Sequence, residues 1–245
     1  MGDGAAMTVE AVIFDWGGTL TPWHQVDPNG AWQSFAGVLA DPADEALVVA
    51  LCAAEQDAWD RSRDDHSGAT LDAIMRAAGV DCGHERHAAA VAAYHDWWVP
   101  HTFIDPDAIG LLSALRADGL RIGVLSNTVW SRGVHEEVFR RDGVLDLIDG
   151  AVYSSEIRYA KPHPAAFRAA MDAVGITAPD AVYVGDRLFE DVYGAQQAGM
   201  RAILVPHSTI PDRQRGHTDG VPDAVVQRLG DVLAVVRQWN EAAGA

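Results

Sequence analysis

The chain has 245 residues, 49% of them hydrophobic and 22% charged, so it can bury a core in one domain or in a domain that carries an insertion. Its formal net charge of −17 at pH 7 argues against nucleic acid and against an anionic membrane as partners, because both require a basic surface. With two cysteines, no signal peptide and no run of about 18 apolar residues, we expect a cytoplasmic protein.

The first predicted strand, AVIF at residues 11–14, leads directly into Asp15. The chain then turns on Gly17 and Gly18 before Thr19. A carboxylate at the end of a buried strand, followed by a glycine turn, is well placed to act as a nucleophile or as a metal ligand.

The next segment, residues 22–99, has a helical pattern throughout, with apolar residues three and four positions apart and no convincing strand. The predicted helices cover residues 31–40, 44–62, 70–79 and 86–98. We therefore expect an all-helical cap domain inserted into a core that consists of residues 1–21 and 100–245.

Beyond residue 100, short apolar strands alternate with helices. The predicted strands are 121–126, 150–155, 181–186 and 201–206, and the predicted helices are 107–118, 131–141, 164–174, 190–198 and 223–239. This alternation predicts an α/β protein in which helices cover both faces of a Rossmann-like parallel sheet. In such sheets the ligand site lies outside the carboxyl ends of the strands.

Polar side chains that could take part in catalysis or in metal binding follow the predicted strands at that edge. In chain order they are Ser126, Asn127, Lys161 (the only lysine of the chain), Asp186 and Asp191. Together with Asp15, the two later aspartates would repel one another strongly in a low dielectric. A bound cation would relieve that repulsion, and a set of oxygen ligands suits Mg²⁺.

The segments FDWGGT, VLSNT, YAKPHP and VGDRLFED closely resemble, in order, the four motifs of the haloacid dehalogenase-like hydrolase superfamily, and the helical insertion resembles its C1 cap. The resemblance extends from Val9 to the last helix. It implies an Mg²⁺ site made by Asp15, Asp186 and the backbone carbonyl of Gly17, which Asp191 supports through water. Asp15 would also be the nucleophile and form an aspartyl-phosphate.

The same resemblance assigns roles to the other candidates. Lys161 would neutralise charge between the nucleophile and the phosphoryl oxygens. Ser126 and Asn127 would hold phosphoryl oxygens or orient the substrate. Thr19 would steady the turn, and it is assigned with Gly18 to substrate binding.

Phosphatases of the superfamily carry a second aspartate at the position of Gly17, where it protonates the leaving group and then activates water. General acid–base catalysis of this kind contributes about 10²–10⁴-fold. We therefore expect a slow or selective Mg²⁺-dependent phosphatase that acts on a small phosphorylated metabolite. Either its substrate has a good leaving group, as in an aryl or acyl phosphate, or a histidine replaces the acid, and the candidates are His24, His163 and His207.

Three other functions deserve comparison with this one. Phosphonoacetaldehyde hydrolases also have a small residue at this position, but they need a cap lysine for a Schiff base, and residues 1–160 contain none. Haloacid dehalogenases also lack the second aspartate but work without Mg²⁺, so Asp186 and Asp191 argue against carbon–halogen cleavage. Trp97 and Trp98 could line an apolar pocket for such a substrate, although packing is their ordinary role. A protein that binds a phosphorylated ligand without turnover is the third alternative.

Two further clusters carry weaker signals. Cys82, His84 and His87 lie close together, but no second ligand cluster accompanies them, so we do not expect zinc. Arg61 and Arg63 could reach a substrate, but pairing with neighbouring aspartates is favoured. The sequence carries no signal that sets the oligomeric state.

Overall fold

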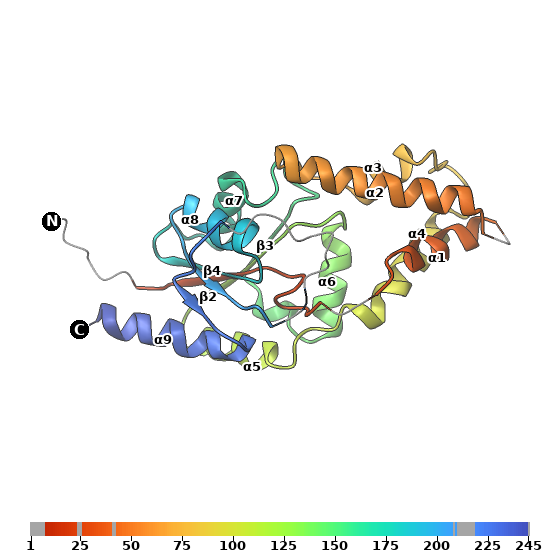
Figure 1. Ribbon diagram of the computed structural model, residues 1–245. Coiled ribbons are helices and arrows are strands. Elements are labelled where there is room, and N and C mark those ends of the chain that lie inside the picture. Colours follow the sequence, from red (N-terminus) through yellow and green to blue (C-terminus); the bar gives the residue numbers. More distant parts are fainter. Residues whose placement is uncertain (1–7, 24–25, 41–42, 208, 210–218, 245) are drawn as a thin grey trace.

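The computed structural model describes residues 8–23, 26–40, 43–207, 209 and 219–244. Its sheet has six strands in the order β3-β2-β1-β4-β5-β6, and every neighbouring pair is parallel. The strands are β1 (Ala11–Phe14), β2 (Arg121–Ser126), β3 (Gly150–Tyr153), β4 (Ala181–Gly185), β5 (Arg201–Leu204) and β6 (Ala224–Val225). The predicted α/β class with a Rossmann-like parallel sheet is confirmed (Figure 1).

Alternate residues of the central strand β1 pack into two separate apolar layers. Val12 and Phe14 belong to one layer, and Ala11 and Ile13 belong to the other. The first layer contains α5 (Ala108–Ala117), α6 (Arg132–Arg141) and α9 (Val232–Ala243), and the second contains α7 (Pro164–Val174) and α8 (Gly194–Gln197). Because side chains alternate across a strand and both faces are covered, each strand is a continuous apolar run.

Between β1 and β2 the chain forms a helical segment, coloured from red-orange to yellow in Figure 1. Its helices are α1 (Asn29–Leu39), α2 (Glu45–Asp65), α3 (Leu71–Ala77) and α4 (His87–Trp98). Asp44 and Thr70 cap α2 and α3, since their side chains accept hydrogen bonds from backbone N–H groups of the first turn. Helix α1 packs on α4 through Trp32 and Tyr94, whose ring centroids lie 4.5 Å apart. Neither these nor the other described helices combine the length and apolarity that crossing a bilayer requires.

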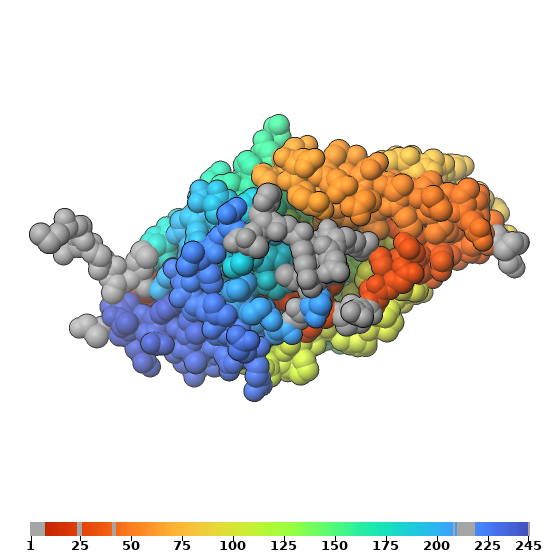
Figure 2. Space-filling view, in the orientation of Figure 1, coloured from red at the N-terminus to blue at the C-terminus, as the bar shows by residue number. Residues whose placement is uncertain are grey.

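The helical segment meets the sheet-bearing part of the molecule along one side, where the orange helix abuts the green and teal segments (Figure 2). Ser67, just after α2, forms an isolated antiparallel bridge with Tyr159. Leu71 N donates a hydrogen bond to Val129 O at 2.8 Å, which ties the start of α3 to the loop after β2. These backbone contacts join the segment to loops at the carboxyl edge of the sheet.

The prediction of a helix over residues 223–239 is wrong at its start. Ala224 and Val225 form β6, a 3₁₀ turn follows at Leu229–Asp231, and α9 begins only at Val232. Tertiary pairing is the cause. The short strand extends the sheet beside β5, and the Asp223 carboxylate accepts a hydrogen bond from Ala202 N at 2.8 Å. A two-residue edge strand leaves no periodicity that a sequence pattern can register.

Candidate active site

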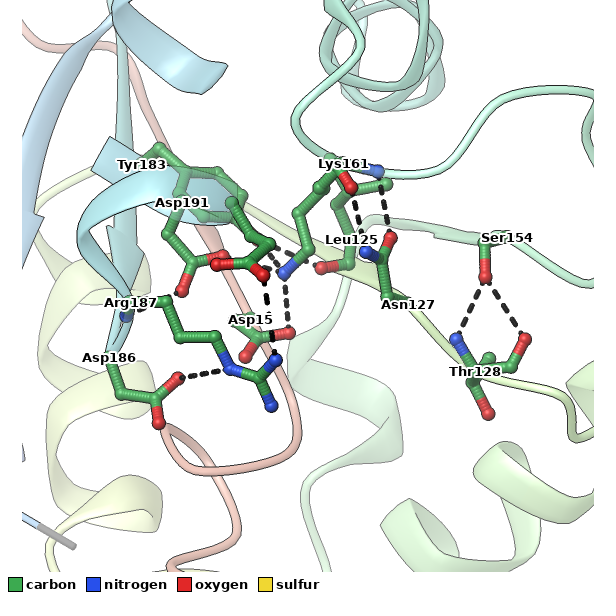
Figure 3. A network of polar contacts seen from close by, with 11 residues as sticks. Asp15, Leu125, Asn127, Thr128, Ser154, Lys161, Tyr183, Asp186, Arg187 and Asp191 are labelled. Atoms are coloured by element: carbon green, nitrogen blue, oxygen red, sulfur yellow. Dashed lines mark hydrogen bonds and ion pairs between the residues drawn. The ribbon is translucent and has the colours of Figure 1, made fainter. Parts of the chain in front are cut away.

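Adjacent strands deliver the candidate residues to one edge of the sheet. Asp15 follows β1, which lies between β2 and β4, and these neighbours end at Ser126 and just before Asp186. Lys161 comes from the loop between β3 and α7. Asp191 lies in a short π-helical turn, Leu188–Tyr193, directly after β4. The sequence prediction that these side chains meet at the carboxyl edge agrees with their positions (Figure 3).

Lys161 is 4% exposed and makes three polar contacts. Its Nζ donates to Asp15 Oδ1 at 2.7 Å, to Asp191 Oδ1 at 2.7 Å and to Tyr183 Oη at 2.8 Å. Tyr183 in turn donates to Leu125 O at 2.9 Å, which fixes its hydroxyl. Burial alone would lower the pKa of Lys161, but the two carboxylates outweigh it and raise the pKa above its usual value. The lysine is therefore a fixed positive charge beside Asp15.

Asn127 holds the backbone of the Lys161 loop with both ends of its amide. Its Nδ2 donates to Lys161 O at 2.9 Å, and its Oδ1 accepts from Lys161 N at 2.8 Å. Ser126, 1% exposed, and Asn127 both line the cavity described below. In this arrangement the amide positions the lysine, and it reaches the cavity only with the remaining surface of its side chain.

Three buried carboxylates converge beside the lysine. The oxygen atoms that Asp15, Asp186 and Asp191 offer lie within 4.8 Å of one another. Burial raises the pKa of Asp15 to about 6, although Lys161 lowers it, and burial raises that of Asp186 well above its usual value despite Arg187. Arg187 also approaches the cluster, but it pairs with Glu190 as well. Lys161 and Arg187 therefore do not balance three carboxylates in a low dielectric, and the cluster favours a further cation.

Among the three carboxylates, Asp186 most clearly indicates a metal site. Both of its carboxylate oxygens are buried and have no hydrogen-bond partner among the described residues. Arg187 forms a long ion pair with Asp186, since its Nε lies 4.0 Å from Asp186 Oδ1. Buried carboxylate oxygens without donors are costly unless a cation satisfies them, and hard oxygen ligands suit Mg²⁺. The residues present therefore fit that ion.

The glycine turn brings the backbone against this cluster. Gly18 has φ +97°, and a Cβ there would lie 2.2 Å from Asp186 Oδ2, so both conformation and space require glycine. Thr19 is fully buried, and its N donates to Trp16 O at 3.3 Å. Neither Gly18 nor Thr19 lines the cavity, whereas Gly17 does. A Cβ on Gly17 would lie 3.3 Å from Trp23 Cζ2, so an indole occupies the space beside the missing second carboxylate.

A cavity of about 180 Å³ opens above Asp15, between the sheet edge and the helical segment. Its tryptophan, tyrosine and phenylalanine lining residues come from both parts of the chain and are Trp16, Trp23, Trp59, Tyr94, Trp98, Trp130 and Phe189. Arg63 also lines it, while its Nη2 lies 3.3 Å from Asp60 Oδ1. Arg61 and Trp97 do not line it. The walls thus combine several large aromatic side chains with polar ones, among them Arg63 and Glu55 from α2.

The histidines that could replace the missing acid are distributed differently from the prediction. His163 and His207 do not line the cavity, and His24 lies outside the described residues. His66 and His101 line it instead. They lie at the end of α2 and in the turn after α4, so only tertiary packing brings them to the site and no local sequence signal marks them.

Cys82, His84 and His87 are not among the described side chains whose ligand atoms converge. In the part of the chain that the structure describes, the only group of three or more such side chains with converging ligand atoms is that of Asp15, Asp186 and Asp191.

The chain is similar in sequence and in fold to known proteins. A family profile described as haloacid dehalogenase-like hydrolase matches residues 9–199. The chain belongs to this family. The resemblance to the superfamily is therefore confirmed, and the protein is a hydrolase of the haloacid dehalogenase-like type.

The relatives of this haloacid dehalogenase-like hydrolase carry two kinds of name. A glyceraldehyde 3-phosphate phosphatase of Methanopyrus kandleri is 31% identical over 235 residues, covering 94% of this chain and 98% of its own. A 2-haloacid dehalogenase of Pseudomonas syringae pv. tomato DC3000 has a TM-score of 0.66 at 26% identity and covers 95% and 100% of the two chains. A phosphatase of the family from Thermococcus onnurineus has a TM-score of 0.63 at 22% identity, covering 93% and 98%.

Proposed function

We propose that this hydrolase is an Mg²⁺-dependent phosphatase that acts on a small phosphorylated metabolite through an aspartyl-phosphate on Asp15. The observation that carries the proposal is the buried Asp186 carboxylate, which lacks hydrogen-bond donors beside two further carboxylates. The M. kandleri relative, named as a phosphatase of glyceraldehyde 3-phosphate, supports a phosphate ester as substrate.

In the proposed reaction a carboxylate oxygen of Asp15 forms a bond to phosphorus while the bond to the leaving oxygen breaks. The leaving group departs with the electron pair, and water later cleaves the aspartyl-phosphate to release inorganic phosphate. Lys161, fixed by Asp191 and Tyr183, keeps positive charge beside the nucleophile. Ser126, at the cavity wall, would hold phosphoryl oxygens.

Asp15, Asp186 and the carbonyl of Gly17 would hold Mg²⁺, with Asp191 supporting it through water. When bound, the ion would neutralise charge on the phosphoryl group and on the carboxylates. Asp191 also accepts a hydrogen bond from Arg187 N at 2.9 Å, which fixes its orientation. Gly18 would keep the backbone close to the site.

Residues 22–99 would act as a C1-type cap on a core of residues 1–21 and 100–245. Trp59, Tyr94 and Trp98 from this segment line the cavity together with residues of the sheet edge, which supports a role in selecting the substrate. Neither Cys52 nor Cys82 forms a disulfide, which supports a reducing, cytoplasmic setting.

Carbon–halogen cleavage is the second candidate, and two observations favour it. The P. syringae dehalogenase shares the fold at 26% identity, and Gly17 lacks the carboxylate that phosphatases use. The Asp186 carboxylate, which has no hydrogen-bond donor among the described residues, argues for the metal-dependent reaction instead, because a dehalogenase of this family needs no metal there.

The decisive experiment measures phosphate release from an aryl and an alkyl phosphate with and without Mg²⁺, and halide release from a 2-haloacid. We expect Mg²⁺-dependent release from the aryl ester and a loss of about 10³-fold or more in Asp15→Asn, because an amide is not a nucleophile. Asp172→Asn, the same change on the exposed face of α7, is the matched control and should retain activity.

Halide release that needs Asp15 but not Mg²⁺ would establish the dehalogenase instead. Binding of Mg²⁺ and phosphate without any turnover would mean that the protein is a phospho-ligand binding protein. Full phosphatase activity in Asp15→Asn would contradict the proposed nucleophile.

A further inference from the structure

Trp23 packs over the glycine turn at the position that lacks the second carboxylate. Its indole crosses the glycine turn, with Cζ2 3.3 Å from the position of a Cβ on Gly17 and Nε1 2.4 Å from that of a Cβ on Gly18. The latter position is also 2.2 Å from Asp186 Oδ2, so the indole N–H and the carboxylate approach the same point of the backbone. Trp23 also lines the cavity above Asp15.

The indole nitrogen of Trp23 is buried and has no hydrogen-bond partner among the described residues. An indole N–H can only donate, and a buried donor without an acceptor destabilises the fold. Such a group is tolerated best where a ligand supplies the acceptor. Trp16 and Trp98 also have unpartnered indole nitrogens at this cavity, but Trp23 is the one packed across Gly17 and Gly18.

The step that lacks an acid is the departure of the leaving group. When the phosphorus–oxygen bond breaks, the electron pair and the negative charge stay on the leaving oxygen. A carboxylic acid at position 17 would transfer a proton to that oxygen. An indole N–H keeps its proton at neutral pH, so it can stabilise the charge by a hydrogen bond but cannot neutralise it.

We propose that the N–H of Trp23 hydrogen-bonds the leaving oxygen, and that the substrate is an aryl phosphate whose phenolate departs unprotonated. This inference rests on the phosphatase function proposed above. No proton is transferred in the step: Asp15 gains the phosphoryl group, the phenolate leaves with the electron pair, and it takes a proton from solvent afterwards. The aromatic walls of Trp59, Tyr94 and Trp98 fit a planar leaving group.

The hydrolysis of the aspartyl-phosphate decides which kinetic constant reports on Trp23. Water must cleave the aspartyl-phosphate without a carboxylate at position 17, so this hydrolysis limits kcat. The ratio kcat/KM reports the steps up to departure of the leaving group and therefore isolates the step in which Trp23 acts.

The test compares wild type, Trp23→Phe and Trp239→Phe on a series of aryl phosphates whose phenols grade in acidity, plus one alkyl phosphate, in the presence of Mg²⁺. Trp23→Phe keeps an aromatic ring and removes the N–H. We expect kcat/KM to fall about 10- to 100-fold for the least acidic phenols and much less for the most acidic ones. Trp239 lies in α9 with Arg201 over its ring, far along the chain from the cavity residues, so its variant is the matched control.

Activity on the most acidic phenol shows that Trp23→Phe is folded. A uniform loss across the whole series would assign Trp23 to packing and overturn the inference, as would no change at all. Equal kcat/KM of wild type for alkyl and aryl esters would also overturn it. If wild type releases no phosphate from any ester, the proposed phosphatase function fails and the inference with it, whereas Asp15-dependent release that is insensitive to Trp23 defeats the inference alone.

Discussion

His135 is a fully buried imidazole in the wall behind the cavity. It stacks on Tyr153 at 4.3 Å between ring centroids and meets the edge of Trp16 at 4.5 Å. Its Nε2 lies 3.1 Å from Thr128 Oγ1. Burial, aided by His95 and Arg132, lowers the pKa of His135 to about 3, so the ring is neutral in the folded protein at neutral pH.

This buried ring predicts a pH dependence of stability. Between pH 6.5 and about 3 the unfolded chain binds a proton at this position that the folded chain does not, so the contribution is complete above pH 6.5 and is lost as the pH falls. The loss approaches about 1.4 kcal/mol per pH unit in that window. We expect the free energy of unfolding of His135→Gln to fall less steeply than that of wild type between pH 6.5 and 4.5, as measured by urea titration.

His84→Gln is the control for that measurement, because His84 is an exposed histidine in the loop before α4. Its stability should follow the wild-type pH profile. Parallel profiles for wild type and His135→Gln would show that the imidazole of His135 titrates normally.

Among the individual residues of the site, the sequence predicts the charged side chains but not the residues that contact them. Asp15, Lys161 and Asp186 are polar residues that follow apolar strands, and that contrast is visible without a structure. Tyr183 lies inside the apolar run of β4, where a tyrosine is indistinguishable from a core residue. Trp23 reaches the glycine turn only because the chain folds back over it, and no residue spacing records that contact.

One junction between elements controls how α2 approaches the loop of Lys161. Ala160 N donates to His66 O at 2.7 Å, and Gly68 N donates to Arg158 O at 3.2 Å. Gly68 packs so closely that a Cβ there would lie 1.9 Å from Ser154 O, a backbone atom that cannot move aside as a side-chain tip would. The junction therefore requires glycine for space.

We expect Gly68→Ala to lower Tm by several degrees, because the added methyl group must push apart the two chain segments that meet at this junction. The free energy of unfolding should fall by about 1–3 kcal/mol. It should also reduce phosphate release, since the displaced segment leads into Lys161. Differential scanning fluorimetry and the phosphate assay measure the two effects.

Gly37→Ala is the control for Gly68→Ala, because it adds the same methyl group where there is space for it. Gly37 is exposed within α1, and a Cβ there would meet nothing within 4 Å. Alanine is favoured over glycine in a helix by about 1 kcal/mol, so this variant should raise Tm slightly. Equal Tm values for Gly68→Ala and wild type would contradict the packing argument.

Helices and strands that carry a strong local sequence pattern are predictable, and those with a weak pattern are not. Strand β1 and helix α7 begin and end at the predicted residues, since an uninterrupted apolar run and a Pro164 start with a Gly175 end are local signals. Strand β6 has no such signal, because its pairing with β5 depends on where the rest of the sheet lies.

For the molecule as a whole, the buried acidic cluster adds to an already negative chain. The net charge of −17 and the three converging carboxylates both favour unfolding, so a cation that binds only the folded state should stabilise it. At a concentration of 100 times its dissociation constant, the ion would add about 2.7 kcal/mol. We expect Mg²⁺ to raise Tm by several degrees in a thermal melt.

NaCl at matched ionic strength is the necessary control, because salt also screens the net charge. The rise in Tm caused by Mg²⁺ should be largely lost in Asp186→Asn, which removes a charged ligand from the cluster. If NaCl raises Tm as much as Mg²⁺ does, or if Asp186→Asn responds like wild type, the cluster does not bind the ion.

The buried position of Lys161 also gives the protein a natural chemical reporter. It is the only lysine, and its amine is held by three oxygens beneath the cavity, so reagents that acylate lysine side chains have one target, whose nitrogen is engaged in hydrogen bonds. Acylation must wait until the amine leaves its partners. The rate at which this single side chain is modified therefore measures how often the amine leaves Asp15, Asp191 and Tyr183.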